Sequence, residues 1–165
     1  MLDAVVERVF ASVLDRCAGF LGQGAKILEL SAFCGSLLAA ALIARHLVWQ
    51  GLTLFAFAQI AAAVAARTQA TPLTDIYRSV AFAALPFAFA LDAPERALAA
   101  TFFMFGIAAN NAVAMKFGRT PVGASELLIA FILAGVFPAW FGLIAYAGGV
   151  LCFVAAGIEA SRRAG

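Results

Sequence analysis

Charged residues are scarce in this chain, and their scarcity excludes a soluble globular domain. Only 12% of the 165 residues are Asp, Glu, Lys or Arg, whereas 65% are apolar, and the mean hydropathy is +1.01. Soluble domains contain about 45–50% apolar residues. Too few polar side chains remain to cover a water-exposed surface. The net charge of +2 is also too small to indicate a nucleic-acid partner.

The residues that build most metal, redox and hydrolytic sites are equally few. There is one histidine, His46, and there are three cysteines, Cys17, Cys34 and Cys152, which share no metal-ligand spacing. We expect the cysteines to be reduced and buried as small apolar side chains. The sequence contains no Ser–His–Asp set and no glycine-rich phosphate loop. The first 24 residues carry acids and lack a continuous apolar core, so we expect no cleavable signal peptide.

What the chain does contain is six apolar stretches separated by short polar segments. Each is a candidate membrane span, although several are shorter than the ~17–25 residues that usually cross a bilayer. They are Leu30–Ala44, Leu52–Ala66, Ser79–Leu91, Ala97–Met115, Pro121–Phe137 and Ala139–Ile158.

Basic residues alternate between the segments that join these stretches. Nine of the eleven Lys and Arg residues lie in the N-terminal segment, the second and fourth loops and the tail, and only Arg45 and Arg96 lie on the opposite side. By the positive-inside rule, both termini are expected in the cytoplasm.

Residues 2–21 form a separate amphipathic element. Apolar side chains recur at helical spacing on one face, and Asp15 and Arg16 are among the polar residues of the other. We expect this helix either to lie in the membrane interface or to pack on the membrane helices. The predicted fold is therefore an all-α integral membrane protein, with an amphipathic juxtamembrane helix in residues 1–24 and six transmembrane helices in residues 25–165.

Few polar groups fall within the predicted spans, and these are the candidates for a polar cavity. Glu29, Glu126 and Glu159 lie near predicted cytoplasmic ends, where they are either functional carboxylates or interfacial ones paired with Lys26 or Arg119. Gln59 and Asn110 are expected to form hydrogen bonds between helices. The candidate polar cavity comprises Glu29, Gln59, Asn110 and Glu126. Small residues, among them Gly106, Gly135, Gly148 and Gly149, are expected where helices approach closely.

Several segments, in this order and spacing, resemble the CDP-alcohol phosphatidyltransferases. They are MLDAVVERVFASVLDR at the start, SAFCGSLLAAALIA at Ser31–Ala44, LFAFAQIAAAVAAR at Leu54–Arg67 followed by Thr71-Pro72, LPFAFALDAP at Leu85–Pro94 and FPAWFGLIAYAGGVLCFVAAGIEA at Phe137–Ala160. The resemblance implies a six-helix, usually dimeric enzyme of the bacterial cytoplasmic (inner) membrane. Its N-terminal amphipathic helix would be cytoplasmic.

Enzymes of that family carry the motif D-G-x2-A-R-x8-G-x3-D-x3-D, whose acids bind divalent metal at the diphosphate of a CDP-linked lipid. Here Ala66 and Arg67 match Ala-Arg, but Ala62 and Ala63 replace Asp-Gly. Ungapped counting puts Val80 and Ala84 at the last two acids. A five-residue deletion would instead bring Asp75 and Ser79 there.

One surviving carboxylate is too few to hold a pair of divalent cations. We therefore expect a pseudoenzyme with no cofactor and no catalytic residue, in which Ala62, Ala63, Ala66, Arg67, Asp75 and Ser79 form a vestigial motif. Its partners would be membrane lipids and other membrane subunits, or a second copy in a dimer.

Two alternatives remain open at the level of sequence. One is an active phospholipid-synthesising phosphotransferase with a non-standard Mg²⁺ or Mn²⁺ site using Asp75, Glu29 or Glu126. The other is lipid or small-molecule binding or transport in the vacated cavity.

Overall fold

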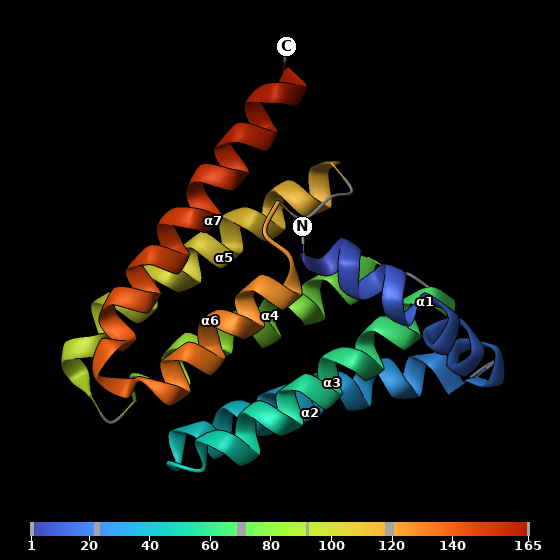
Figure 1. Ribbon diagram of the computed structural model, residues 1–165, viewed down its shortest axis with the longest axis horizontal. Coiled ribbons are helices and arrows are strands. Elements are labelled where there is room, and N and C mark those ends of the chain that lie inside the picture. Colours follow the sequence, from blue (N-terminus) through green and yellow to red (C-terminus); the bar gives the residue numbers. More distant parts are fainter. Residues whose placement is uncertain (1, 22–23, 69–71, 92, 118–120, 165) are drawn as a thin grey trace.

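The computed structural model describes residues 2–21, 24–68, 72–91, 93–117 and 121–164, and every regular element in them is helical (Figure 1). In chain order the elements are α1 (Leu2–Leu21), α2 (Ala25–Ala44), α3 (Val48–Thr68), α4 (Pro72–Ala88), η2 (Pro94–Arg96), α5 (Ala97–Phe117), α6 (Ala124–Val136), η3 (Pro138–Trp140) and α7 (Phe141–Ala164).

Four of the helical segments are long and apolar enough to cross a membrane. They are Ala25–Ala44, Val48–Thr68, Pro94–Phe117 and Pro138–Arg163. Two further apolar segments, Ile76–Ala90 and Ala124–Val136, are shorter. Each of the six predicted apolar stretches thus contains a helix, and four of these helical segments have the length of a complete span.

Helices α5 and α7 run in the same direction. At their beginnings, the Arg96 guanidinium lies 5.8 Å from the ring centre of Phe141. At their far ends, the Arg163 guanidinium lies 5.8 Å from the ring centre of Phe117. The chain must return from the end of α5 to the beginning of α7. Helix α6 makes this return and therefore runs in the opposite direction to both, as Figure 1 shows.

Helices α2 and α4 are related in the same way. Near their beginnings, the rings of Phe33 and Tyr77 stack with centres 4.7 Å apart. Helix α3 connects the end of α2 to the beginning of α4 and runs in the opposite direction to both. The helices from α2 to α7 therefore alternate in direction. The turns α2–α3, α4–α5 and α6–α7 lie toward one end, at the left of Figure 1.

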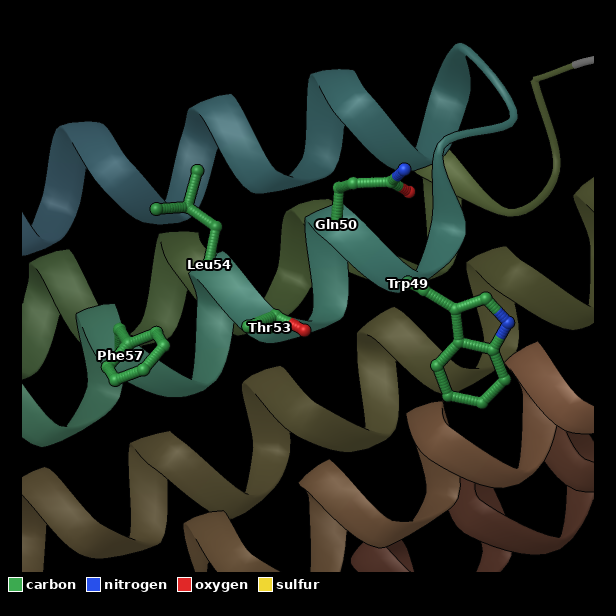
Figure 2. A pocket seen from close by; sticks show the side chains of 5 residues that line it. All are labelled: Trp49, Gln50, Thr53, Leu54 and Phe57. Atoms are coloured by element: carbon green, nitrogen blue, oxygen red, sulfur yellow. The ribbon is translucent and has the colours of Figure 1, made fainter.

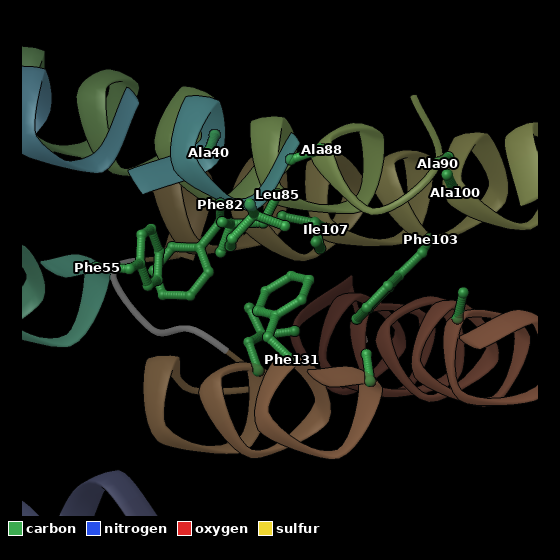
Figure 3. Packing of buried hydrophobic residues seen from close by; sticks show 14 of the residues in the cluster. Ala40, Phe55, Phe82, Leu85, Ala88, Ala90, Ala100, Phe103, Ile107 and Phe131 are labelled. Atoms are coloured by element: carbon green, nitrogen blue, oxygen red, sulfur yellow. The ribbon is translucent and has the colours of Figure 1, made fainter. Parts of the chain in front are cut away.

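A buried apolar cluster joins the helix pair α2–α3 to the pair α5–α7 through α4 and α6 (Figure 3). Phe55 of α3 meets Phe82 of α4 edge to face, with ring centres 5.1 Å apart. Phe131 of α6 lies 5.5 Å from Phe103 of α5. These rings are at most 2% exposed, so large aromatic side chains fill the centre of the molecule.

Glycine allows α5 and α7 to touch through their backbones. A Cβ atom at Gly106 would lie 2.8 Å from the carbonyl oxygen of Gly149, and one at Gly148 would lie 2.7 Å from the ring of Phe103. The predicted close approach at these glycines is confirmed. A second contact was not predicted: a Cβ atom at Gly51 of α3 would lie 2.7 Å from the carbonyl oxygen of Ala39 of α2.

Two sequence-based expectations were wrong. The segment before Ser79 was expected to be a polar loop, yet α4 begins at Pro72, a residue whose missing N–H costs nothing in a first helical turn. The cysteines were expected to be buried, but only Cys152 is; Cys17 and Cys34 are exposed on α1 and α2. Apolar helices with lipid-facing sides give no sequence signal for which face is buried.

Candidate functional site

The vestigial motif begins on the last turns of α3. Ala62 and Ala66 are half-buried, one turn apart, and Ala63 is exposed. Arg67 follows Ala63 by one turn and is half-buried. The two positions where the family motif requires Asp and Gly thus carry methyl groups, which offer no ligand to a metal.

Arg67 forms an ion pair with Asp15 of α1. Its Nη1 donates a hydrogen bond to Asp15 Oδ1 across 52 residues of sequence. Helix α1 also contacts α3 and α6. The arginine that matches the family motif therefore joins the amphipathic helix to the end of α3.

The second half of the motif falls on α4. Ile76 and Val80, at the ungapped Gly and Asp positions, are exposed apolar side chains, 46% and 45% accessible. Ser79 is half-buried. The side chain of Asp75 lies outside the described residues. Among the side chains described, no group of three or more His, Cys, Asp or Glu residues could hold a metal ion.

Gln59 joins α3 to α2. Its Nε2 donates to Ser36 Oγ over 3.2 Å, and Ser36 Oγ donates to the carbonyl oxygen of Ala32 over 2.9 Å. Ser36 is only 1% exposed. These are the hydrogen bonds expected of an amide that links helices rather than one that binds a ligand.

Asn110 joins α5 to the segment that precedes α6. Its Nδ2 donates to the carbonyl oxygen of Val122 over 2.9 Å, and its Oδ1 accepts from the Val122 N–H over 2.8 Å. Asn110 is 1% exposed. Both the N–H and the carbonyl oxygen of the side-chain amide are hydrogen-bonded, so Asn110 satisfies the backbone of a residue outside any helix. Asn110 and Gln59 bond to different partners and share no hydrogen bond.

The three glutamates near the predicted cytoplasmic ends of the spans have different environments. Glu159 accepts from Nε of Arg163, one turn later, over 2.9 Å. Glu126 is half-buried in the first turn of α6, where the helix dipole favours a carboxylate. Glu29 is half-buried in α2, and its Oε1 is buried without a hydrogen bond from the described part of the chain. Arg119 lies outside the described residues.

Two open depressions on the described surface are the most pronounced, and the residues assigned to the vestigial motif line neither of them. The first, of about 580 Å³, lies along the outer face of α3 (Figure 2) and is lined by Trp49, Gln50, Thr53, Leu54 and Phe57. The second, of about 410 Å³, lies at the ends of α5 and α7 and is lined by Ala112, Val113, Lys116, Phe117, Ala160 and Arg163.

Sequence reasoning missed the partners of the motif and cavity residues. It placed Asp15 on the polar face of the amphipathic helix but gave no signal that this acid meets Arg67. It did not single out Ser36 or Val122 either. The Glu159–Arg163 pair could have been predicted from the sequence, because its spacing of four residues is the usual one for an ion pair on a helix.

No family model, curated protein or solved structure matches the chain. Assignment to a family therefore depends on the residues quoted above and on the helix arrangement.

Proposed function

We propose that this chain is a non-catalytic membrane protein with a CDP-alcohol phosphatidyltransferase-like scaffold, acting as a subunit or scaffold in a membrane protein assembly. The observation that carries the proposal is the end of α3. Ala62 and Ala63 occupy the Asp-Gly positions of the motif, so the acid expected at residue 62 is missing, and Arg67 is paired with Asp15. The chain keeps the architecture that the resemblance implies, an amphipathic helix followed by alternating apolar helices.

Six membrane spans are part of this proposal. The shared direction of α5 and α7 supports a crossing by α6, and the shared direction of α2 and α4 supports one by α3. Helix α6 has 13 residues, or about 20 Å at 1.5 Å per residue, against a hydrocarbon core of about 30 Å. Flanking residues and local thinning of the bilayer would supply the difference.

Cytoplasmic termini are also part of this proposal. Lys116 and Arg163 lie at the ends of α5 and α7 opposite the turns, and Lys26 and Arg67 lie at the corresponding ends of α2 and α3. Only Arg45 and Arg96 lie beside the turns. The positive-inside rule then favours a cytoplasmic position for the basic end, in a bacterial inner membrane.

The filled interior favours a scaffold over a transporter. Phe55, Phe82, Phe103 and Phe131 pack in the centre of the described helices and are almost fully buried (Figure 3). A binding or transport route through this centre would require these rings to move together. Close-packed cores resist such movement because each displaced side chain loses its contacts.

An assembly role is supported by the outer face of α3. Trp49 and Phe57 are 55% and 66% exposed, and Gln50 and Thr53 lie beside them in the same depression (Figure 2). Polar side chains on a membrane helix commonly form hydrogen bonds with a neighbouring helix, and each such bond contributes about 0.6 kcal/mol. A second membrane helix, from another subunit or a second copy, would satisfy them.

The test is the stoichiometry of the protein after mild solubilisation. Native mass spectrometry is expected to find the chain in a complex of defined composition, either with a partner or as a dimer. The Gln50→Leu/Thr53→Val variant should weaken the complex up to about tenfold and raise the fraction of monomer, whereas Gln59→Leu, which alters a contact inside the chain, should leave the complex intact. A wild-type protein that is monomeric in every mild detergent would contradict the assembly role.

A further inference from the structure

Two cations converge on one aromatic ring at the ends of α5 and α7. The Lys116 Nζ lies 5.3 Å from the ring centre of Phe117, and the Arg163 guanidinium lies 5.8 Å from the same point. Like charges repel, so this convergence raises the positive potential at the end of the helix pair. An anion bound between the two side chains would relieve that repulsion.

Most of the donors on these cations remain available. Arg163 donates through Nε to Glu159, which leaves its two terminal nitrogens, and a guanidinium has five N–H donors in all. Lys116 is exposed and has no acidic partner within the described segments. Arg162, also exposed, adds a third positive charge against the single carboxylate of Glu159.

Below the charges, the depression is apolar. Ala112 and Val113 of α5 and Ala160 of α7 line it, and its volume is about 410 Å³. Positive charge at the helix ends above an apolar trough matches the two parts of an anionic lipid, a phosphate headgroup and an acyl chain.

We propose that this depression binds an anionic phospholipid, with its phosphate between Lys116 and Arg163 and an acyl chain along Ala112, Val113 and Ala160. Basic pockets between membrane helices at the cytoplasmic side are suited to such headgroups. The site requires α5 and α7 to span the bilayer, but it is separate from the vestigial motif. It would exist whether or not the protein catalyses phosphotransfer.

The experiment measures lipid retention by the purified full-length chain. Protein in a non-ionic detergent is titrated with phosphatidylglycerol, phosphatidylcholine or inorganic phosphate, and bound lipid is counted by native mass spectrometry. Phosphatidylglycerol should bind at least tenfold more tightly than phosphatidylcholine. In the Lys116→Gln/Arg163→Gln variant its affinity should fall about 30-fold, since each basic residue near an anionic surface contributes roughly fivefold.

Two further variants separate a specific site from charge alone. Lys26→Gln/Arg78→Gln removes two positive charges from α2 and α4 and should keep the wild-type affinity within about threefold. Lys116→Arg/Arg163→Lys preserves both charges of the site and should also keep it. Each variant must elute as the wild type does in size-exclusion chromatography.

Three results would overturn the proposal. They are equal retention of the two lipids, an equal loss of affinity in the two double-Gln variants, and displacement of phosphatidylglycerol by an equal concentration of inorganic phosphate. The last would mean that the site binds a free anion rather than a lipid.

Discussion

The backbone contact between Gly106 and Gly149 predicts that one added methyl group at residue 106 loosens the α5–α7 pair. The Cβ atom of alanine would lie 2.8 Å from the carbonyl oxygen and 2.9 Å from the Cα atom of Gly149, and 3.2 Å from Cys152 Cβ. Two of these three atoms are backbone, so no side-chain rotation relieves the overlap. The helices must separate.

The magnitude follows from two opposing terms. Overpacking of a well-packed interior costs about 1–3 kcal/mol, and the rigid backbone partner puts Gly106→Ala toward the upper end. Replacing glycine by alanine within a helix gains about 1 kcal/mol. We expect a net destabilisation of about 2 kcal/mol.

The assay is unfolding of the purified protein in mixed micelles by increasing SDS, followed by circular dichroism. Gly157→Ala in α7 is the matched control, because a Cβ atom there meets nothing within 4 Å. It should leave the stability unchanged or raise it by up to about 1 kcal/mol. Equal stabilities of Gly106→Ala and Gly157→Ala would refute the close backbone packing of α5 on α7.

Two further predictions concern the polar contacts between elements. Asn110→Leu should destabilise the protein by at least about 2 kcal/mol in the same unfolding assay. It leaves both backbone groups of Val122 buried without a partner, and each such group costs about 1–3 kcal/mol. Gln59→Leu should cost less than about 1 kcal/mol, and an equal effect of the two changes would contradict these roles. For Asp15 and Arg67, a double-mutant cycle with Asp15→Asn and Arg67→Gln should give a coupling energy of about 0.5 kcal/mol that decreases in high salt, since Asp15 is largely exposed. A coupling of zero at low salt would mean that the pair does not anchor α1.

The sequence patterns predicted the helices well, because helix formation by apolar segments is a local property. The amphipathic segment 2–21 coincides with α1, and the stretch Leu30–Ala44 shares its last residue with α2. The short helix Pro138–Trp140 lies at the boundary between the predicted stretches Pro121–Phe137 and Ala139–Ile158. The beginning of α4 was missed because polar residues after Pro72 were interpreted as a loop.

Helix pairing was much harder to predict. In a soluble helix, the apolar face shows which side is buried, but a membrane helix is apolar toward both lipid and protein. Residue patterns therefore could not show that α5 packs parallel to α7, or that Gly51 touches α2. Small residues at Gly106 and Gly149 were a usable signal, because close approach requires them irrespective of the surroundings.

In the candidate site, too, some features could be predicted from the sequence and others depend on how the helices pair. The absence of a carboxylate at Ala62 is visible in the sequence, and the hydrogen bond of Gln59 between helices was expected from its polarity. Asn110 was also expected to bond between helices, but it bonds to the backbone of Val122 outside any helix. The pairing of Arg67 with Asp15 was not expected, because the two residues are 52 positions apart and only the fold brings them together.

The most direct test of the central claim is CMP release. Purified protein in mixed micelles is given CDP-diacylglycerol, Mg²⁺ or Mn²⁺, and a panel of acceptor alcohols, and free CMP is measured over time. The proposed loss of the metal-binding acids predicts no CMP above the rate without protein. Metal-dependent release of CMP that requires both an acceptor alcohol and the intact chain would contradict the account and favour an enzyme with a non-standard metal site.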